Sequence, residues 1–164
     1  METKQPHTVR HTMTIGAYLG VALTLYSLLI TFTGLDKYIV IQFLYFLFIV
    51  GGITASIVLY RRGLDEPLIF KKAFAIGFYT VAFSAIITGF YNYLYIRFTP
   101  GASEGVLKAF VDAMPKTYTP EQTQELMAFF QNHVVGMYVA MNIMSSLMYG
   151  ALFSAVIAFW ARKR

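Results

Sequence analysis

Long uncharged apolar runs alternate with short polar segments along the chain. Residues 13–33, 38–60, 73–96 and 134–161 contain no charged side chain. At about 1.5 Å of rise per helical residue, each run is long enough to cross a hydrocarbon layer of roughly 30 Å. The pattern therefore predicts an all-α membrane protein with four transmembrane helices.

The polar segments between these runs set how the helices connect. Residues 34–37 can form only a tight turn, so the first two helices must be antiparallel neighbours. Residues 61–72 form the next loop, and residues 1–12 form a polar lead-in, with no small-residue cleavage pattern after the first run. We predict a single domain over residues 1–164, an antiparallel four-helix bundle.

The long segment of residues 97–133 is expected to hold one or two short amphipathic helices. Ser103 can cap a first helix that Pro115 ends. Its apolar face is formed by Val106, Leu107, Phe110, Val111 and Met114. A second helix start is Thr119-Pro120-Glu121-Gln122, with a capping Thr, a Pro at the first helical position and a Gln at the third. This second helix can continue into the fourth span, and we expect the apolar faces on the bilayer surface or over the mouth of the bundle.

Composition supports the membrane interpretation. Hydrophobic residues make up 57% of the chain, charged residues only 13%, and there is no cysteine. The net charge of +5 comes from short clusters beside the apolar runs, which is typical of membrane orientation and not of nucleic-acid binding. Because no ionisable acid or base lies within a span, an ion-coupled transporter is disfavoured.

The basic residues predict the orientation. Nine of the thirteen lie in the lead-in, the central loop and the C-terminus, and four lie on the opposite side. The positive-inside rule then places both termini in the cytoplasm and residues 97–133 outside. The residues expected to anchor this topology at lipid headgroups are Arg61, Arg62, Lys71, Lys72, Arg162, Lys163 and Arg164.

Each span carries a stripe of small or polar residues, as helices that associate in lipid require. The residues expected to pack the helices are Gly16, Gly20, Gly52, Ser56, Gly77, Ser84, Gly150 and Ser154. Packing within one chain is the favoured interpretation. Gly16 and Gly20 could instead form a homo-oligomer through a GxxxG contact.

Three amides lie at a similar depth in the predicted spans. Gln42, Asn92 and Asn142 are each about 30 Å from the cytoplasmic boundary at helical rise. With Tyr45, Tyr91 and Tyr138 they form a candidate vestibule that opens outward and could hold a small ligand or a lipid headgroup. The alternative, which we favour, is that these side chains bond to one another, to backbone or to water.

No residue set indicates catalysis. His7 and His11 are four apart, yet two histidines without a third ligand make a weak metal site, and we interpret both as solvated. His133 is expected to lie at the membrane interface. We therefore predict no metal, no cofactor and no enzymatic activity.

One stretch carries a family resemblance. Phe70 to Gly77 contains Lys-x-Ala-Phe-x-x-Gly, and the chain closes with Ala161-Arg162-Lys163-Arg164. Together with the four-span layout, this resembles an uncharacterised family of inner-membrane proteins, described as a domain of unknown function and common in Bacteroidetes. The resemblance implies the topology and a bacterial source, and it implies no activity.

Two functions remain open on this basis. The first is a non-enzymatic accessory, interaction or envelope component whose partners are membrane lipids and another membrane protein or a second copy of itself. The second is a small carrier, channel or lipid-binding protein that uses the polar vestibule.

Overall fold

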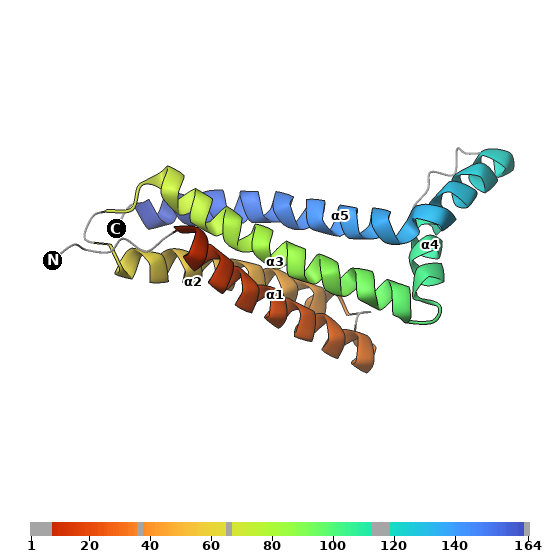
Figure 1. Ribbon diagram of the computed structural model, residues 1–164, viewed down its shortest axis with the longest axis horizontal. Coiled ribbons are helices and arrows are strands. Elements are labelled where there is room, and N and C mark those ends of the chain that lie inside the picture. Colours follow the sequence, from red (N-terminus) through yellow and green to blue (C-terminus); the bar gives the residue numbers. More distant parts are fainter. Residues whose placement is uncertain (1–7, 36–37, 65–66, 113–118, 163–164) are drawn as a thin grey trace. The chain divides into compact units, whose positions relative to one another are not determined.

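The structure is a computed structural model that describes residues 8–35, 38–64, 67–112 and 119–162. The α-helices in these ranges are α1 (Thr8–Thr33), α2 (Ile39–Arg62), α3 (Phe70–Phe98), α4 (Ala102–Asp112) and α5 (Pro120–Arg162) (Figure 1). Four of the five, all except α4, contain stretches long and apolar enough to cross a membrane. The prediction of four apolar spans in an all-helical chain is confirmed.

Helix α1 begins earlier than the apolar run that predicted it. It starts at Thr8, so that residues expected in a polar lead-in are helical. The hydroxyls of Thr12 and Thr14 donate to the carbonyls of Thr8 and Arg10 one turn before them. The difference arises because an apolar run reports the length of hydrocarbon crossed, whereas a helix can continue beyond the hydrocarbon.

Helix α5 begins at the predicted capping sequence and continues as one helix through the fourth span. The backbone N–H of Gln122 donates to Thr119 Oγ1 at 3.3 Å, and the backbone N–H of Thr119 donates to Gln122 Oε1 at 3.1 Å. These reciprocal bonds form a capping box, which satisfies two backbone donors at the start of the helix. The expectation that this helix runs directly into the fourth span is confirmed.

Helix α4 differs from its prediction at its start. Ser103 lies inside the helix, which begins at Ala102 after Gly101, whose φ is +78°. Gly101 can adopt this left-handed conformation without a Cβ clash, so the chain turns there. Met114 and Pro115, which were expected on the apolar face and at the end of this helix, lie outside the described residues.

The chain divides into two compact units. The first comprises Met1–Thr88 and Ile143–Arg164, and the second comprises Gly89–Asn142. The boundaries fall inside α3 and inside α5. The single-domain organisation stays a prediction.

Large apolar side chains cover the outside of the first unit, whereas small hydroxyl groups lie inside it. Phe32, Leu47 and Trp160 are among the exposed residues, while Ser56, Thr80 and Ser154 are fully buried. A water-soluble protein keeps its large apolar residues inside, and an exposed apolar surface of this extent marks contact with lipid or protein. The fold therefore suits a multi-pass membrane protein.

Candidate functional site

Small residues let the helices of the first unit approach closely. A Cβ added at Gly16 would lie 2.7 Å from the Thr80 carbonyl oxygen, and one at Gly20 would lie 2.8 Å from Ile87 Cβ. Helix α3 therefore covers this face of α1. A homo-oligomer through Gly16 and Gly20 would have to displace α3.

The other predicted packing residues also lie between helices of this unit. Gly52 meets the Leu19 side chain, Gly150 meets Val81, and Gly77 meets Ser154. Ser84 is buried, and its hydroxyl donates to the Val81 carbonyl.

One buried hydrogen bond joins two helices directly. Ser56 Oγ of α2 lies 2.7 Å from Thr80 Oγ1 of α3. Thr80 Oγ1 also donates to the Ile76 carbonyl at 2.8 Å. Because a hydroxyl has a single proton, Ser56 must be the donor in the bond between the helices.

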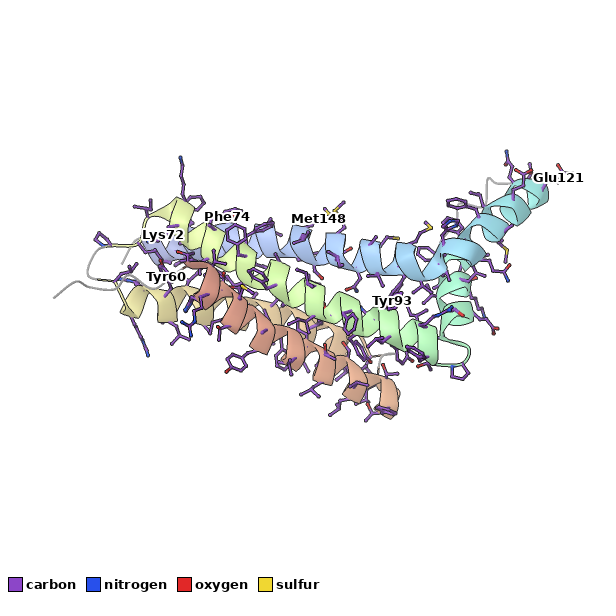
Figure 2. All side chains as sticks on the ribbon, viewed as in Figure 1. Tyr60, Lys72, Phe74, Tyr93, Glu121 and Met148 are labelled. Carbon is purple, nitrogen blue, oxygen red and sulfur yellow. The ribbon has the colours of Figure 1, made fainter. Side chains whose placement is uncertain are left out.

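A cluster around Tyr60 was not anticipated from the sequence (Figure 2). The Tyr60 hydroxyl lies 2.9 Å from Thr8 Oγ1, and the Lys72 ammonium lies 5.2 Å from the centre of the Tyr60 ring, a cation–π contact. The Tyr60 side chain is 1% exposed. Lys72, expected at lipid headgroups, thus contacts a protein ring.

His11 belongs to the same cluster, which corrects its interpretation as a solvated histidine. Its Nε2 lies 2.9 Å from the Ser56 carbonyl oxygen, and its ring meets the Tyr60 ring edge-on at 5.3 Å. Because a carbonyl can only accept, Nε2 must carry the proton. The sequence signal for this cluster is that Thr8, His11 and Thr12 are three and four residues apart and so share one helical face. The charged Arg10 in the same segment led to its interpretation as a polar lead-in.

The predicted vestibule residues fall in different units. Asn92, Asn142, Tyr91 and Tyr138 belong to the second unit, together with Tyr95. The Tyr91 and Tyr95 rings lie 6.0 Å apart. Asn142 Oδ1 is buried and has no hydrogen-bond partner.

The remaining vestibule residues lie in the first unit. Tyr45 is half-buried and packs near the apolar core of that unit. The side chain of Gln42 lies outside what the structure describes. Four of the six predicted vestibule residues therefore lie in one unit, and the structure does not describe a ring of three amides.

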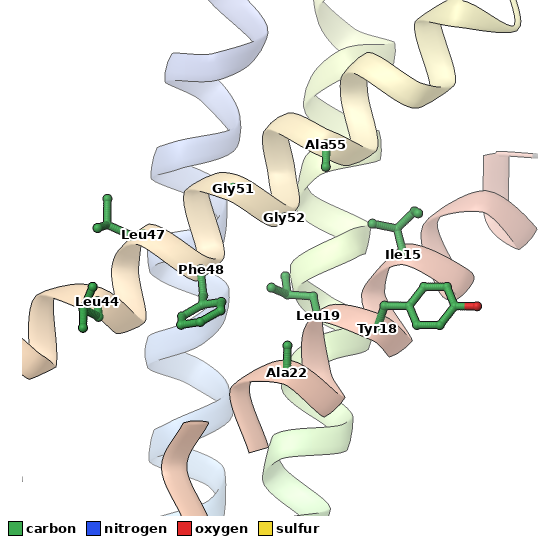
Figure 3. A pocket seen from close by; sticks show the side chains of 10 residues that line it. All are labelled: Ile15, Tyr18, Leu19, Ala22, Leu44, Leu47, Phe48, Gly51, Gly52 and Ala55. Carbon is green, nitrogen blue, oxygen red and sulfur yellow. The ribbon is translucent and has the colours of Figure 1, made fainter. Parts of the chain in front are cut away.

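An apolar groove of about 540 Å³ lies between α1 and α2 (Figure 3). Tyr18, Leu19, Leu44, Leu47 and Phe48 form its walls, and Gly51 and Ala55 of α2 are exposed in it. A Cβ added at Gly51 would meet no atom within 4 Å, so the α2 backbone is accessible there. The groove offers surface for close packing, and its described lining residues include no His, Asp, Glu, Lys or Arg.

The outer segment contributes an aromatic contact within the second unit. Phe110 of α4 stacks on Phe130 of α5, with ring centres 5.6 Å apart and planes nearly parallel. The apolar face of α4 thus packs at least in part against α5. His133 donates from Nδ1 to the Phe129 carbonyl one turn earlier.

The predicted headgroup anchors differ in exposure. Arg62 and Lys71 are exposed, whereas Arg61 and Lys72 are half-buried. The Arg162 side chain and the residues Lys163 and Arg164 lie outside the described part of the chain. Over the described residues, no group of three or more His, Cys, Asp or Glu side chains could hold a metal ion.

Comparison with known proteins identifies a family. The model of a family described as "Protein of unknown function (DUF4199)" matches residues 14–163. No curated protein and no solved structure matches the chain. Since the match spans all four apolar helices, the chain belongs to the DUF4199 family.

Proposed function

We propose that the chain is a non-enzymatic accessory protein of the bacterial inner membrane that binds a transmembrane helix in the groove between α1 and α2. Both termini and residues 61–72 face the cytoplasm in this proposal, on the evidence of the positive-inside rule. The partner is another membrane protein or a second copy of the chain.

The observation that carries the proposal is that the α2 backbone is accessible in the groove at Gly51 and Ala55. Helices in lipid gain little from hydrophobic burial, so they associate where small residues let two backbones approach. Gly51 and Ala55 are small residues four positions apart, the spacing at which two residues share one face of a helix, and both are exposed. The glycines at positions 16, 20, 52, 77 and 150, by contrast, already meet neighbouring helices.

Site-specific photocrosslinking tests this proposal in intact membranes. A photoreactive residue at Ala55 should give a protein adduct, whose mass distinguishes a second copy from another protein. The same residue at Leu152, an exposed position on α5 outside the groove, is the control. Filling the groove with Gly51→Leu should abolish the Ala55 adduct, and a persistent adduct would show that the groove is not the contact.

A second candidate, a small carrier, channel or lipid-binding protein, is favoured by one specific observation. The buried, unpartnered Asn142 Oδ1 lies in the same unit as Tyr91, Tyr95 and Tyr138. A buried acceptor without a donor costs about 1–3 kcal/mol, which a ligand with an N–H or O–H group could recover.

Thermal unfolding in detergent, with a panel of small hydroxyl and amine compounds and lipids, tests this second candidate. A ligand at a hundred times its Kd stabilises the folded state by about 2.7 kcal/mol. Asn142→Leu should remove that stabilisation and should raise the melting temperature of the ligand-free protein. A ligand effect that survives Asn142→Leu would exclude this site.

A further inference from the structure

A second, smaller cleft lies between α2 and α5 in the first unit, where both helices approach their basic C-terminal ends. Its volume is about 310 Å³. The described residues that line it are Thr54, Ile57, Val58, Arg61, Ile157, Trp160 and Ala161. Further along the same pair of helices, the Phe46 ring packs against Tyr149 and Phe153 at 5.1 and 6.2 Å. Residues nearer the C-terminus of α2 lie beside residues nearer the C-terminus of α5, so these two helices run parallel (Figure 1).

The lining of this cleft is amphipathic. Val58, which is 42% exposed, and the half-buried Ile157 supply apolar surface, and Arg61, half-buried, supplies a cation. None of the described lining residues is acidic. A guanidinium group donates a planar fork of N–H bonds that fits phosphate oxygens.

Trp160 marks the depth of the cleft in the membrane. Its side chain is 72% exposed and stands two residues before Arg162. Tryptophan concentrates at the level of lipid headgroups, because its ring is apolar and its N–H is polar. Arg61 therefore lies where a lipid phosphate lies, and Val58 and Ile157 lie where the acyl chain begins.

We propose that the cleft between α2 and α5 binds one anionic phospholipid, with the headgroup phosphate on Arg61 and an acyl chain along Val58 and Ile157. The inference rests on the membrane-spanning part of the proposed function and is independent of partner binding at the α1–α2 groove. A second copy is the poorer occupant. In a two-fold contact about the membrane normal, equivalent residues meet at the same depth, and the two arginines would repel each other.

The chain contains one tryptophan, Trp160, so its tryptophan fluorescence reports on this cleft alone. Bromine atoms on a lipid acyl chain quench tryptophan fluorescence on contact. We would reconstitute the full chain in vesicles of brominated phosphatidylglycerol and, separately, of brominated phosphatidylcholine, each diluted with its unlabelled counterpart. One basic contact at a membrane surface predicts an about fivefold preference for the anionic lipid at Trp160.

Two neighbouring arginines provide a matched pair of variants. Arg61→Gln should abolish the preference, whereas Arg62→Gln, which removes the same charge from the next, exposed residue, should retain it. Arg61→Lys should retain part of the preference, because the charge stays and the planar fork is lost. This third variant keeps the comparison valid if Arg61→Gln does not fold.

Three results would overturn the inference. Equal losses in Arg61→Gln and Arg62→Gln would indicate a diffuse basic surface without a built site. Equal quenching by both lipids in the unaltered chain would indicate no anionic preference. Quenching by neither lipid would mean that protein covers Trp160 or that the chain is not embedded, and protease protection of the reconstituted chain separates these two cases.

Discussion

At the scale of single residues, close backbone approach and hydroxyl bonding hold the first unit together. Seven buried polar residues of this unit are all serines or threonines: Thr12, Ser56, Thr80, Ser84, Thr88, Ser146 and Ser154. The Ser154 hydroxyl has no hydrogen-bond partner in the structure. A hydroxyl can bond to the preceding turn of its own helix, as Thr88 does to Ser84, and then it remains satisfied in lipid during insertion. It can then add a contact between helices.

Gly16→Ala should destabilise the protein, because the added methyl group would meet the Thr80 carbonyl and Phe83 Cβ, both at 2.7 Å. Neither atom is the end of a flexible side chain, so the helices must separate, at a cost of about 1–3 kcal/mol. Gly51→Ala is the matched control, since it meets no atom within 4 Å and should cost less than about 0.5 kcal/mol. Thermal or denaturant unfolding in detergent measures both, and equal effects would contradict the observed crossing of α1 and α3.

A double-mutant cycle with Ser56→Ala and Thr80→Val should show a favourable coupling between α2 and α3. Hydrogen bonds between helices in membranes contribute about 0.6 kcal/mol on average and at most about 1.7 kcal/mol. Additive single effects would mean that each hydroxyl bonds only within its own helix.

At the scale of elements, helix boundaries depend on caps and turns more than on apolar run length. The first described residues of α1 are already helical, and Thr8 and His11 hydrogen-bond to α2. Helix α1 ends at Thr33 before Gly34, whose φ of +66° is the left-handed conformation common after a helix. The capping box at Thr119 likewise explains why α5 begins well before the fourth apolar run.

Thr119→Ala should fray the start of α5, at a cost of about 1 kcal/mol, because the Gln122 N–H loses its acceptor. Thr119→Ser keeps the hydroxyl and should leave the helix start intact. Amide hydrogen exchange of the first turns of α5 measures the effect. Faster exchange in the serine variant as well would assign the loss to the threonine methyl group.

At the scale of the whole molecule, the proposed orientation in the membrane depends on the distribution of basic residues. The chain lacks cysteine, so single-cysteine variants need no altered background. Gly63→Cys lies just after α2, and Glu104→Cys lies on α4, and both positions are exposed.

A membrane-impermeant maleimide should label Glu104→Cys in intact spheroplasts, and it should label Gly63→Cys only after permeabilisation. This outcome follows from the excess of basic residues on the side of residues 61–72. Labelling of Gly63→Cys in intact cells would reverse the proposed orientation.

The sequence alone determined the helical class, the four spans and the start of α5, because these depend on local properties: uncharged length and a capping sequence. The tertiary structure decided which stripes meet. Gly16 and Gly51 both lie in uncharged apolar runs, yet α3 covers Gly16, whereas Gly51 is exposed in the groove between α1 and α2. It also decided that His11 and Lys72 contact Tyr60, and that Arg61 and Trp160, almost a hundred positions apart in the chain, line one cleft. Such contacts depend on how helices cross, which the periodicity of a single helix does not contain.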